Sequence, residues 1–249
     1  METINQQANI TADWPGRLPS FAEGLLYHKG LIDDSPMASY LNNYFANFTQ
    51  VEKKLVVSAV DVETGLYKTF TEAVGLGNLA TVIRASASIP FIFEPTPFNG
   101  SLYMDGGTTW NINLKDAVDR CLELVDDEAH VVLDVAITEA VHIPLWNETG
   151  CSATNFWRKH QIQRYYGKMN DVIEFAKARP HVNYRHFFQP AESLGHAWDE
   201  MKFDNATTWT FQQTGRDDAK QAINSANDPT ESIPLHTFER VLTNHLTNN

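Results

Sequence analysis

The sequence predicts an α/β fold, with a mixed, mostly parallel β-sheet covered by helices. Continuous apolar, β-branched runs at residues 55–60 and 131–137 are typical of strands buried on both faces of a sheet. From residue 55 onward such runs alternate with segments of helical period, which is the pattern of a sheet covered by helices. With 249 residues and 43% hydrophobic residues, the chain is long and apolar enough to bury a full core.

The first 70 residues predict a helix followed by a hairpin. Residues 1–20 show no hydrophobic period and predict an extended lead-in. Asp34-Ser35-Pro36 is a helix-start signal and predicts a helix over residues 36–47. The run 55–60 predicts a strand, residues 61–65 a turn, and residues 66–70 a second strand.

The middle of the chain predicts a helix, a short strand and a second helix. The first helix spans residues 78–88 and is ended by Pro90. A proline-rich loop leads to a strand at residues 101–104. The second helix spans residues 114–125, and its apolar positions form a buried stripe that includes Cys121, for which we expect a core position.

The C-terminal half predicts two further strands and two longer helices. Residues 130–137 predict a buried strand interrupted by Asp134, which we expect at a strand edge or paired. After a loop at 138–154 come a long helix at 155–178, a strand at 182–188 and a helix at 207–225. Residues 227–249 predict a tail with one short helix near 235–246.

Composition and charge exclude several classes of function. The net charge of −12 disfavours nucleic-acid binding and strong attraction to anionic membranes, because no Lys/Arg run offsets it locally. Cys121 and Cys151 lack metal-site spacing and are expected as reduced thiols. Neither a signal peptide nor a transmembrane run is recognisable, so we expect a cytoplasmic protein, with peripheral membrane association left open.

The most constrained stretch is Asp105-Gly106-Gly107 directly after the strand at 101–104. A glycine pair after an apolar run permits positive φ and close approach of the backbone. Such a turn presents the Asp105 carboxylate at a strand end, where α/β folds often carry their chemistry. The tripeptide alone also fits a simple turn, so the flanking residues decide its interpretation.

With its flanks, this stretch resembles the second half of a patatin-like lipid acyl hydrolase domain. The resemblance is carried by residues 85–90 (ASASIP), then Phe91, Phe93 and Pro95, and by residues 103–107 (YMDGG). It implies that Asp105 is the base of a Ser-Asp dyad that hydrolyses lipid esters. It extends over an order of elements from about residue 24 to 225, so we predict a partial patatin-like domain over residues 21–226, incomplete at its N-terminal side. Asn111-Ile112-Asn113 departs from the family, which usually has Asn-x-Pro there.

The nucleophile expected from this resemblance is absent from the sequence. No Gly-x-Ser-x-Gly elbow occurs, and Gly150-Cys151-Ser152-Ala153 lacks the closing glycine and comes after Asp105. The glycine-rich oxyanion loop is also missing. Ser86 and Ser88 lie in the motif but on no elbow, and are weak candidates for the nucleophile.

Two explanations stay open: the chain is part of a longer or split acyl hydrolase, or it is a non-catalytic relative that binds lipid or protein. Under both, we expect no ester turnover by this chain alone. If a companion chain supplied the serine, the substrate would be a lipid ester. The oligomeric state distinguishes the two explanations: an incomplete sheet should dimerise or need a companion chain, whereas a self-sufficient binding module should be monomeric.

Other candidate residues have simpler interpretations beside the functional ones. Asp61 fits a turn-stabilising role better than a site role. The aromatic residues near Asp105 are candidates for an apolar setting or for plain core positions: Phe91, Phe93, Phe98, Tyr103 and Trp110. His181 and His186 are the closest histidine pair, but no metal-site spacing surrounds them, so we expect neither metal nor cofactor.

Overall fold

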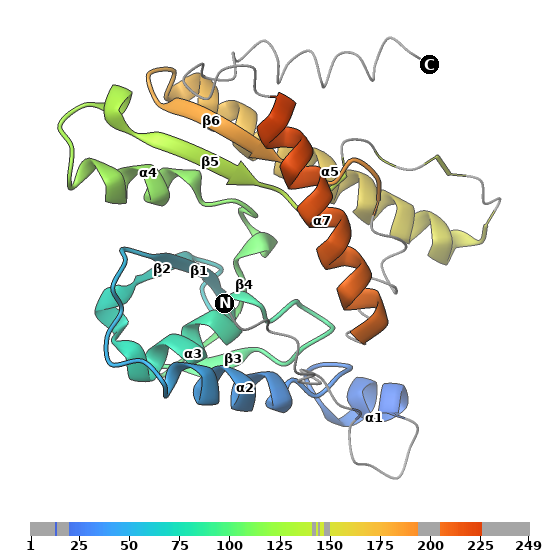
Figure 1. Ribbon diagram of the computed structural model, residues 1–249. Coiled ribbons are helices and arrows are strands. Elements are labelled where there is room, and N and C mark those ends of the chain that lie inside the picture. Colours follow the sequence, from blue (N-terminus) through green and yellow to red (C-terminus); the bar gives the residue numbers. More distant parts are fainter. Residues whose placement is uncertain are drawn as a thin grey trace. The chain divides into compact units, whose positions relative to one another are not determined.

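The computed structural model describes residues 13, 20–140, 143, 145–146, 150–193 and 205–225 (Figure 1). The predicted lead-in at 1–20 lies almost entirely outside these residues, and the predicted tail at 227–249 lies wholly outside them. The chain divides into two compact units, Met1–Asn113 and Leu114–Asn249. Each unit is described separately below.

The first unit is built on a four-stranded sheet with the order β2-β1-β4-β3. Its strands are β1 (Val56–Asp61), β2 (Tyr67–Thr71), β3 (Thr96–Phe98) and β4 (Ser101–Asp105), and all three pairings are antiparallel. The predicted α/β class is confirmed. The expectation of a mostly parallel sheet is wrong for this unit, because short turns join β1 to β2 and β3 to β4.

The turn between β3 and β4 explains the strand that the sequence did not predict. Asn99 and Gly100 have φ angles of 46° and 83°, the left-handed pair that a tight hairpin turn requires. The turn pairs Phe98 with Ser101 and Thr96 with Tyr103. Part of the expected loop is therefore an outer strand, and its proline at position 97 is tolerated there.

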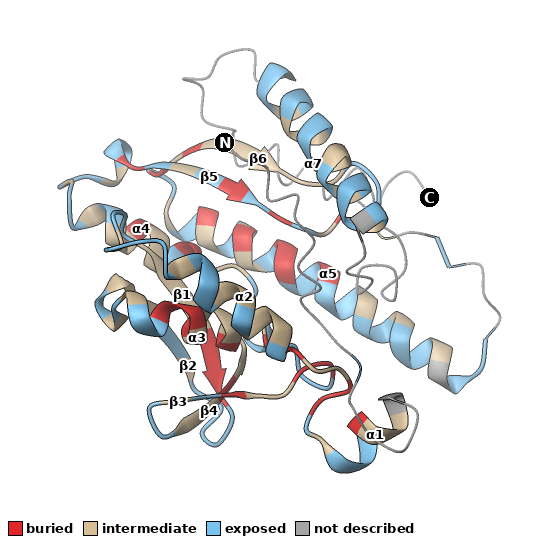
Figure 2. Ribbon diagram, turned by 60° about the horizontal axis from the view of Figure 1, so that its bottom comes forward, coloured by how far each residue is buried: buried red, intermediate tan, exposed pale blue. Residues whose placement is uncertain are grey.

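Three helices accompany this sheet: α1 (Ser20–Tyr27), α2 (Ser35–Phe45) and α3 (Leu76–Ser86). The predictions at 36–47 and 78–88 are confirmed within a few residues. Helix α3 contacts β1, β3 and β4, and Figure 2 shows buried residues gathered on α3 and β1. Ala85 of α3 meets Ala59 and Tyr103 in a core cluster to which Phe70 and Phe98 add partly buried rings. Small residues at 59 and 85 let the helix approach the strand closely.

The second unit contains a parallel pair of strands, β5 (Val132–Ala136) and β6 (Asn183–Phe188). Helix α5 (Ser152–Ala178) lies between them in the chain, as parallel pairing requires a long crossover. Helices α4 (Leu114–Leu122) and α7 (Asn205–Ser225) complete the unit. The predicted elements are present here, and the parallel arrangement expected of the whole sheet occurs in this pair. The expectation that residues 131–137 are buried on both faces is wrong, because the strand alternates between buried positions (131, 135, 137) and exposed ones (132, 134, 136).

The core of the second unit gathers side chains from four segments. The buried cluster contains Val118, Val131, Ala176, Val182 and Tyr184. Cys121 is exposed, so its expected core position is wrong: α4 contributes Val118 and the partly buried Leu122 to the core. Asp134 is paired as expected, through both Arg185 and His186.

None of the helices in the described residues has the length and apolar character needed to cross a bilayer.

Candidate functional site

Asp105 ends β4, and the chain turns sharply after it. Its backbone N–H donates to the carbonyl of Ser88 at 2.9 Å, and its Oδ1 accepts from the backbone N–H of Gly107 at 2.6 Å. The carboxylate thereby caps the short 3₁₀ helix η2 (Gly106–Thr108). The predicted presentation of Asp105 at a strand end is present, and both its main chain and its side chain are anchored.

Neither glycine of the motif has a positive φ, so backbone conformation is not what requires glycine here. Both are required because other atoms lie too close to leave room for a side chain. A Cβ on Gly106 would lie 2.7 Å from the carbonyl oxygen of Ser58, in the neighbouring strand. A Cβ on Gly107 would lie 2.7 Å from Oδ1 of Asn111 and 3.0 Å from Oδ1 of Asp105. Gly106 therefore lets the turn contact β1, and Gly107 leaves room for the carboxylate.

A pocket of about 490 Å³ opens beside Asp105, entirely within the first unit. Its walls come from β1, the start of β2, the end of α3 and the turn after β4. Polar and apolar side chains both face it. The lining residues are Val56, Val57, Ser58, Tyr67, Ile83, Ser86, Ala87, Asp105, Gly106, Gly107, Trp110, Asn111 and Asn113.

Two serine hydroxyls share this pocket with Asp105. Ser86 lies in the last turn of α3, and Ser58 lies in β1. The side-chain amide of Asn113 donates to Ser58 Oγ at 2.8 Å, which fixes that hydroxyl from one side. Sequence reasoning missed Ser58 and Asn113, since nothing local marks a pair 55 residues apart.

Ser88, the other serine of the motif, has a structural role. It is fully buried, and its hydroxyl contacts the carbonyl of Arg84 at 2.9 Å and Thr96 Oγ1 at 2.8 Å. Its own carbonyl holds the amide of Asp105. Ser88 is therefore excluded as a nucleophile and instead anchors the base of the turn.

Some of the aromatic residues predicted near Asp105 lie in the hydrophobic core, and one lines the pocket. Phe93 and Tyr103 are buried in the unit, while Trp110 lines the pocket. The ring of Trp110 stacks edge-on against Tyr67 at 5.0 Å between centroids, an aromatic contact that the sequence did not predict. Phe91 is exposed at positive φ. Of the five predicted aromatic neighbours, Trp110 is the one that forms the wall of the pocket.

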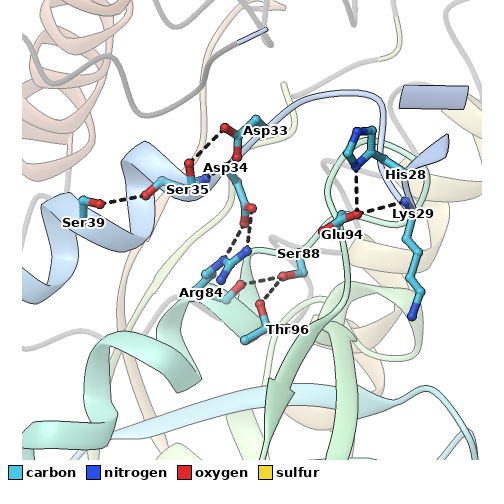
Figure 3. Close-up of polar contacts among 10 residues, drawn as sticks. All are labelled: His28, Lys29, Asp33, Asp34, Ser35, Ser39, Arg84, Ser88, Glu94 and Thr96. Carbon is cyan, nitrogen blue, oxygen red and sulfur yellow. Dashed lines mark hydrogen bonds and ion pairs between the residues drawn. The ribbon is translucent and has the colours of Figure 1, made fainter. Parts of the chain in front are cut away.

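A buried ion pair ties the start of α2 to α3 (Figure 3). Arg84 donates from Nε and Nη2 to the two oxygens of Asp34, both at 2.7 Å, and Asp34 is 2% exposed. This hydrogen bonding raises the pKa of Arg84. The backbone carbonyl of Arg84 accepts a hydrogen bond from the Ser88 hydroxyl. The ion pair, Ser88 and Asp105 therefore form one connected network.

A second contact lies at the far end of the same segment. Gly30 is in contact with the backbone of Phe93 and Glu94, where a Cβ would come within 2.5 Å. Glu94 accepts from the backbone of Lys29 at 3.0 Å and lies 3.7 Å from His28 Nδ1, as Figure 3 shows. Residues 28–34 therefore pack along the loop that precedes β3. These contacts fix the position of the loop, and with it the β3–β4 hairpin that ends at Asp105.

The remaining candidates lie outside the pocket. Asp61 accepts from the backbone N–H groups of Glu63 and Thr64 at 3.0 and 2.9 Å, so the turn-stabilising interpretation is confirmed. The amide of Thr64 is the main reason that the pKa of Asp61 is lowered. His186 contacts Asp134 through Nδ1 at 3.1 Å, and no group of three metal-ligating side chains occurs among the described residues.

The first unit is thus an α/β domain that presents a strand-end carboxylate in a pocket with serine hydroxyls and apolar walls. The sequence model of the family described as patatin-like phospholipase matches residues 2–118. This part of the chain is similar to that family, and the match ends within five residues of the boundary of the first unit. No curated protein matches the chain. The wider resemblance, to residue 225, stays a prediction.

Proposed function

We propose that the first unit is a lipid-ester-binding domain that carries the aspartate of a patatin-like Ser-Asp dyad. The family match supports a function of the lipid-hydrolase type or one related to it. The observation that carries the finer proposal is the setting of Asp105, held by Ser88 and Gly107 and facing a half-apolar pocket.

In such a dyad the carboxylate accepts the proton of a serine hydroxyl while the serine oxygen attacks the ester carbonyl. The proton then passes to the leaving alcohol, and water releases the acyl group from the serine. In water a carboxylate titrates near pH 4 and is a weak base, so the position of the carboxylate relative to the serine proton is what the dyad requires of the fold. The hydrogen bond from the backbone N–H of Gly107 supports this role, because it fixes the carboxylate group at the end of β4.

The chain supplies the aspartate but no Gly-x-Ser-x-Gly elbow and no glycine-rich oxyanion loop. Ser58 and Ser86 line the pocket from a regular strand and a helix end, and neither sits on the strained turn that activates such a nucleophile. We therefore propose that this polypeptide alone does not turn over esters.

The test is hydrolysis of p-nitrophenyl butyrate by the purified chain, with fluorophosphonate labelling in parallel. We expect no turnover above buffer and no labelled band, from protein that melts cooperatively. Turnover abolished by the fluorophosphonate would contradict the proposal. Repeating the assay with Ser58→Ala and Ser86→Ala would then identify the hydroxyl responsible.

The alternative is a non-catalytic module that uses the same pocket for binding only. The apolar walls formed by Val57, Ile83 and Trp110 favour an acyl chain as the ligand under both proposals. Adding a chain that carries the serine elbow separates them, because a pure binding module gains no activity from it. A stable monomer that binds acyl ligands and shows no gain would support the alternative.

A further inference from the structure

The hydroxyl group of Ser58 lines the pocket beside Asp105 and is held from one side. Its Oγ accepts from the side-chain amide of Asn113 at 2.8 Å, so the hydroxyl proton of Ser58 is not part of that bond. Among the described residues, Asn113 is the hydrogen-bond partner of this hydroxyl. Because Ser58 is partly buried in the wall of the pocket, its proton is available to an acceptor that enters there.

Backbone pairing fixes the position of Ser58 beside the turn after Asp105. Ser58 precedes Ala59 in β1, and the partner of Ala59 across the sheet is Asp105. Gly106 lies against the carbonyl of Ser58, where an added Cβ would come within 2.7 Å. On its other side, β1 pairs Ser58 with Thr69 of β2. The hydroxyl group therefore has a fixed place in the pocket wall, as a group that recognises a ligand requires.

Asn113 stands at the position where the family pattern usually has proline. A proline has no polar side chain, so the hydrogen bond to Ser58 would be absent with the usual residue. The departure from the family pattern therefore has a counterpart in the structure, because it orients one hydroxyl group of the pocket.

The charges of the pocket favour a neutral acceptor over an anionic one. Among the described residues that line the pocket, Asp105 is the one with a charged side chain. A ligand carboxylate would meet Asp105 with no cation in this lining to offset the repulsion, and the net charge of −12 adds to it. The carbonyl oxygen of an ester accepts a hydrogen bond without that cost. The apolar walls formed by Val57, Ile83 and Trp110 suit an alkyl chain attached to the carbonyl.

We infer that the Ser58 hydroxyl, oriented by Asn113, donates a hydrogen bond to the carbonyl oxygen of a neutral acyl ester bound in the pocket, and that the pocket disfavours the corresponding free carboxylate. The inference rests on the proposed function and names the group of the ester that the first unit recognises. Ser58 acts here as a specificity-determining residue and not as a nucleophile, because its oxygen forms no bond to the ligand carbon.

Equilibrium dialysis of the purified full chain tests the inference with ligands that share one alkyl chain: methyl octanoate, methyl octyl ether and octanoate. The ether lacks the carbonyl, so we expect it to bind about fivefold more weakly than the ester, the effect of one neutral hydrogen bond. Octanoate should bind roughly tenfold more weakly than the ester, because Asp105 repels it.

Two substitutions remove the donor in different ways. Ser58→Ala deletes the hydroxyl group, and Asn113→Asp replaces the amide donor by a carboxylate that accepts the Ser58 proton. Each should weaken binding of methyl octanoate about fivefold and leave binding of the neutral ether unchanged. The infrared carbonyl stretch of bound methyl octanoate, labelled with carbon-13 at the carbonyl, should lie at lower frequency in the wild type than in either variant.

Thr69→Val is the matched control, because Thr69 is the partner of Ser58 on β2 and its hydroxyl lies outside the pocket lining. It should change neither the affinities nor the carbonyl frequency. Equal binding of ester and ether by the wild type, or a carbonyl frequency unchanged in Ser58→Ala, would overturn the inference and leave acyl binding by the first unit intact. Octanoate bound as tightly as the ester would overturn the preference for a neutral ligand. If none of the ligands bound, both the inference and the proposed function would be overturned.

Discussion

Replacing Gly106 by alanine tests the packing that positions Asp105. The added Cβ would lie 2.7 Å from the carbonyl oxygen and 3.0 Å from the carbonyl carbon of Ser58. An ordinary contact needs roughly 0.7 Å more, and the opposing atoms are the backbone of β1, which is paired with β2 on its other side. Forced overpacking of this kind costs about 1–3 kcal/mol, and the fixed backbone places Gly106→Ala in the upper part of that range.

Urea unfolding followed by tryptophan fluorescence measures this loss as a shift of the midpoint, expected at about 1 M for a slope of ~2 kcal/mol per molar. Gly77→Ala is the matched control. Gly77 lies in α3 with nothing within 4 Å of an added Cβ, so the substitution should stabilise by about 0.5–1 kcal/mol. If Gly106→Ala were as stable as the wild type, the close contact between the turn and β1 would be refuted.

Three further substitutions test the charge network and the two titrating groups. Arg84→Met leaves the Asp34 carboxylate buried without its partner and should cost about 3–5 kcal/mol in urea unfolding, whereas adding Asp34→Asn should recover part of that loss. The pKa of Asp61 is lower in the folded protein than in the unfolded chain, so its ionised form stabilises the fold above the unfolded pKa, and this contribution is lost as pH falls through the folded pKa. In Asp61→Asn, the melting temperature should therefore fall less steeply between about pH 5 and pH 3 than in the wild type. Burial raises the pKa of Tyr184 to about 12, so its stabilisation is full below about pH 10 and is lost as pH rises through the folded value. Tyr184→Phe should reduce the alkaline loss of stability, and the folded wild type and variant should show nearly the same phenolate absorbance near pH 11, because Tyr184 is not yet ionised there.

The sequence was sufficient for features that depend on local patterns. The apolar run before Asp105, the glycine pair after it and the capping signal before Pro36 each correspond to one element in the structure. Asp61 was also predictable, because an Asp followed by Thr-Gly forms its hydrogen bonds within four residues. In each case the physical cause lies within a few positions of the residue itself.

Features that depend on contacts across the chain were not predictable. The alternation of strands and helices suggested a parallel sheet, but the Asn99-Gly100 turn folds Thr96–Phe98 back as a hairpin strand. The pair of Asp34 with Arg84 spans 50 residues, and that of Ser58 with Asn113 spans 55. No local pattern marks such partners.

Cys121 shows the limit of predicting burial from helical periodicity. It belongs to the apolar stripe of the helix in the sequence, yet its side chain is exposed in the structure.

The central claim is that the Asp105 carboxylate is placed to take a proton from a serine that the chain does not itself present on an elbow. The most direct measurement adds a polypeptide carrying the glycine-rich loop and serine elbow of a patatin-like hydrolase, and follows p-nitrophenyl butyrate hydrolysis. We predict turnover from the mixture alone, abolished by Asp105→Asn and retained by Asp61→Asn. Turnover that survives Asp105→Asn would contradict the claim.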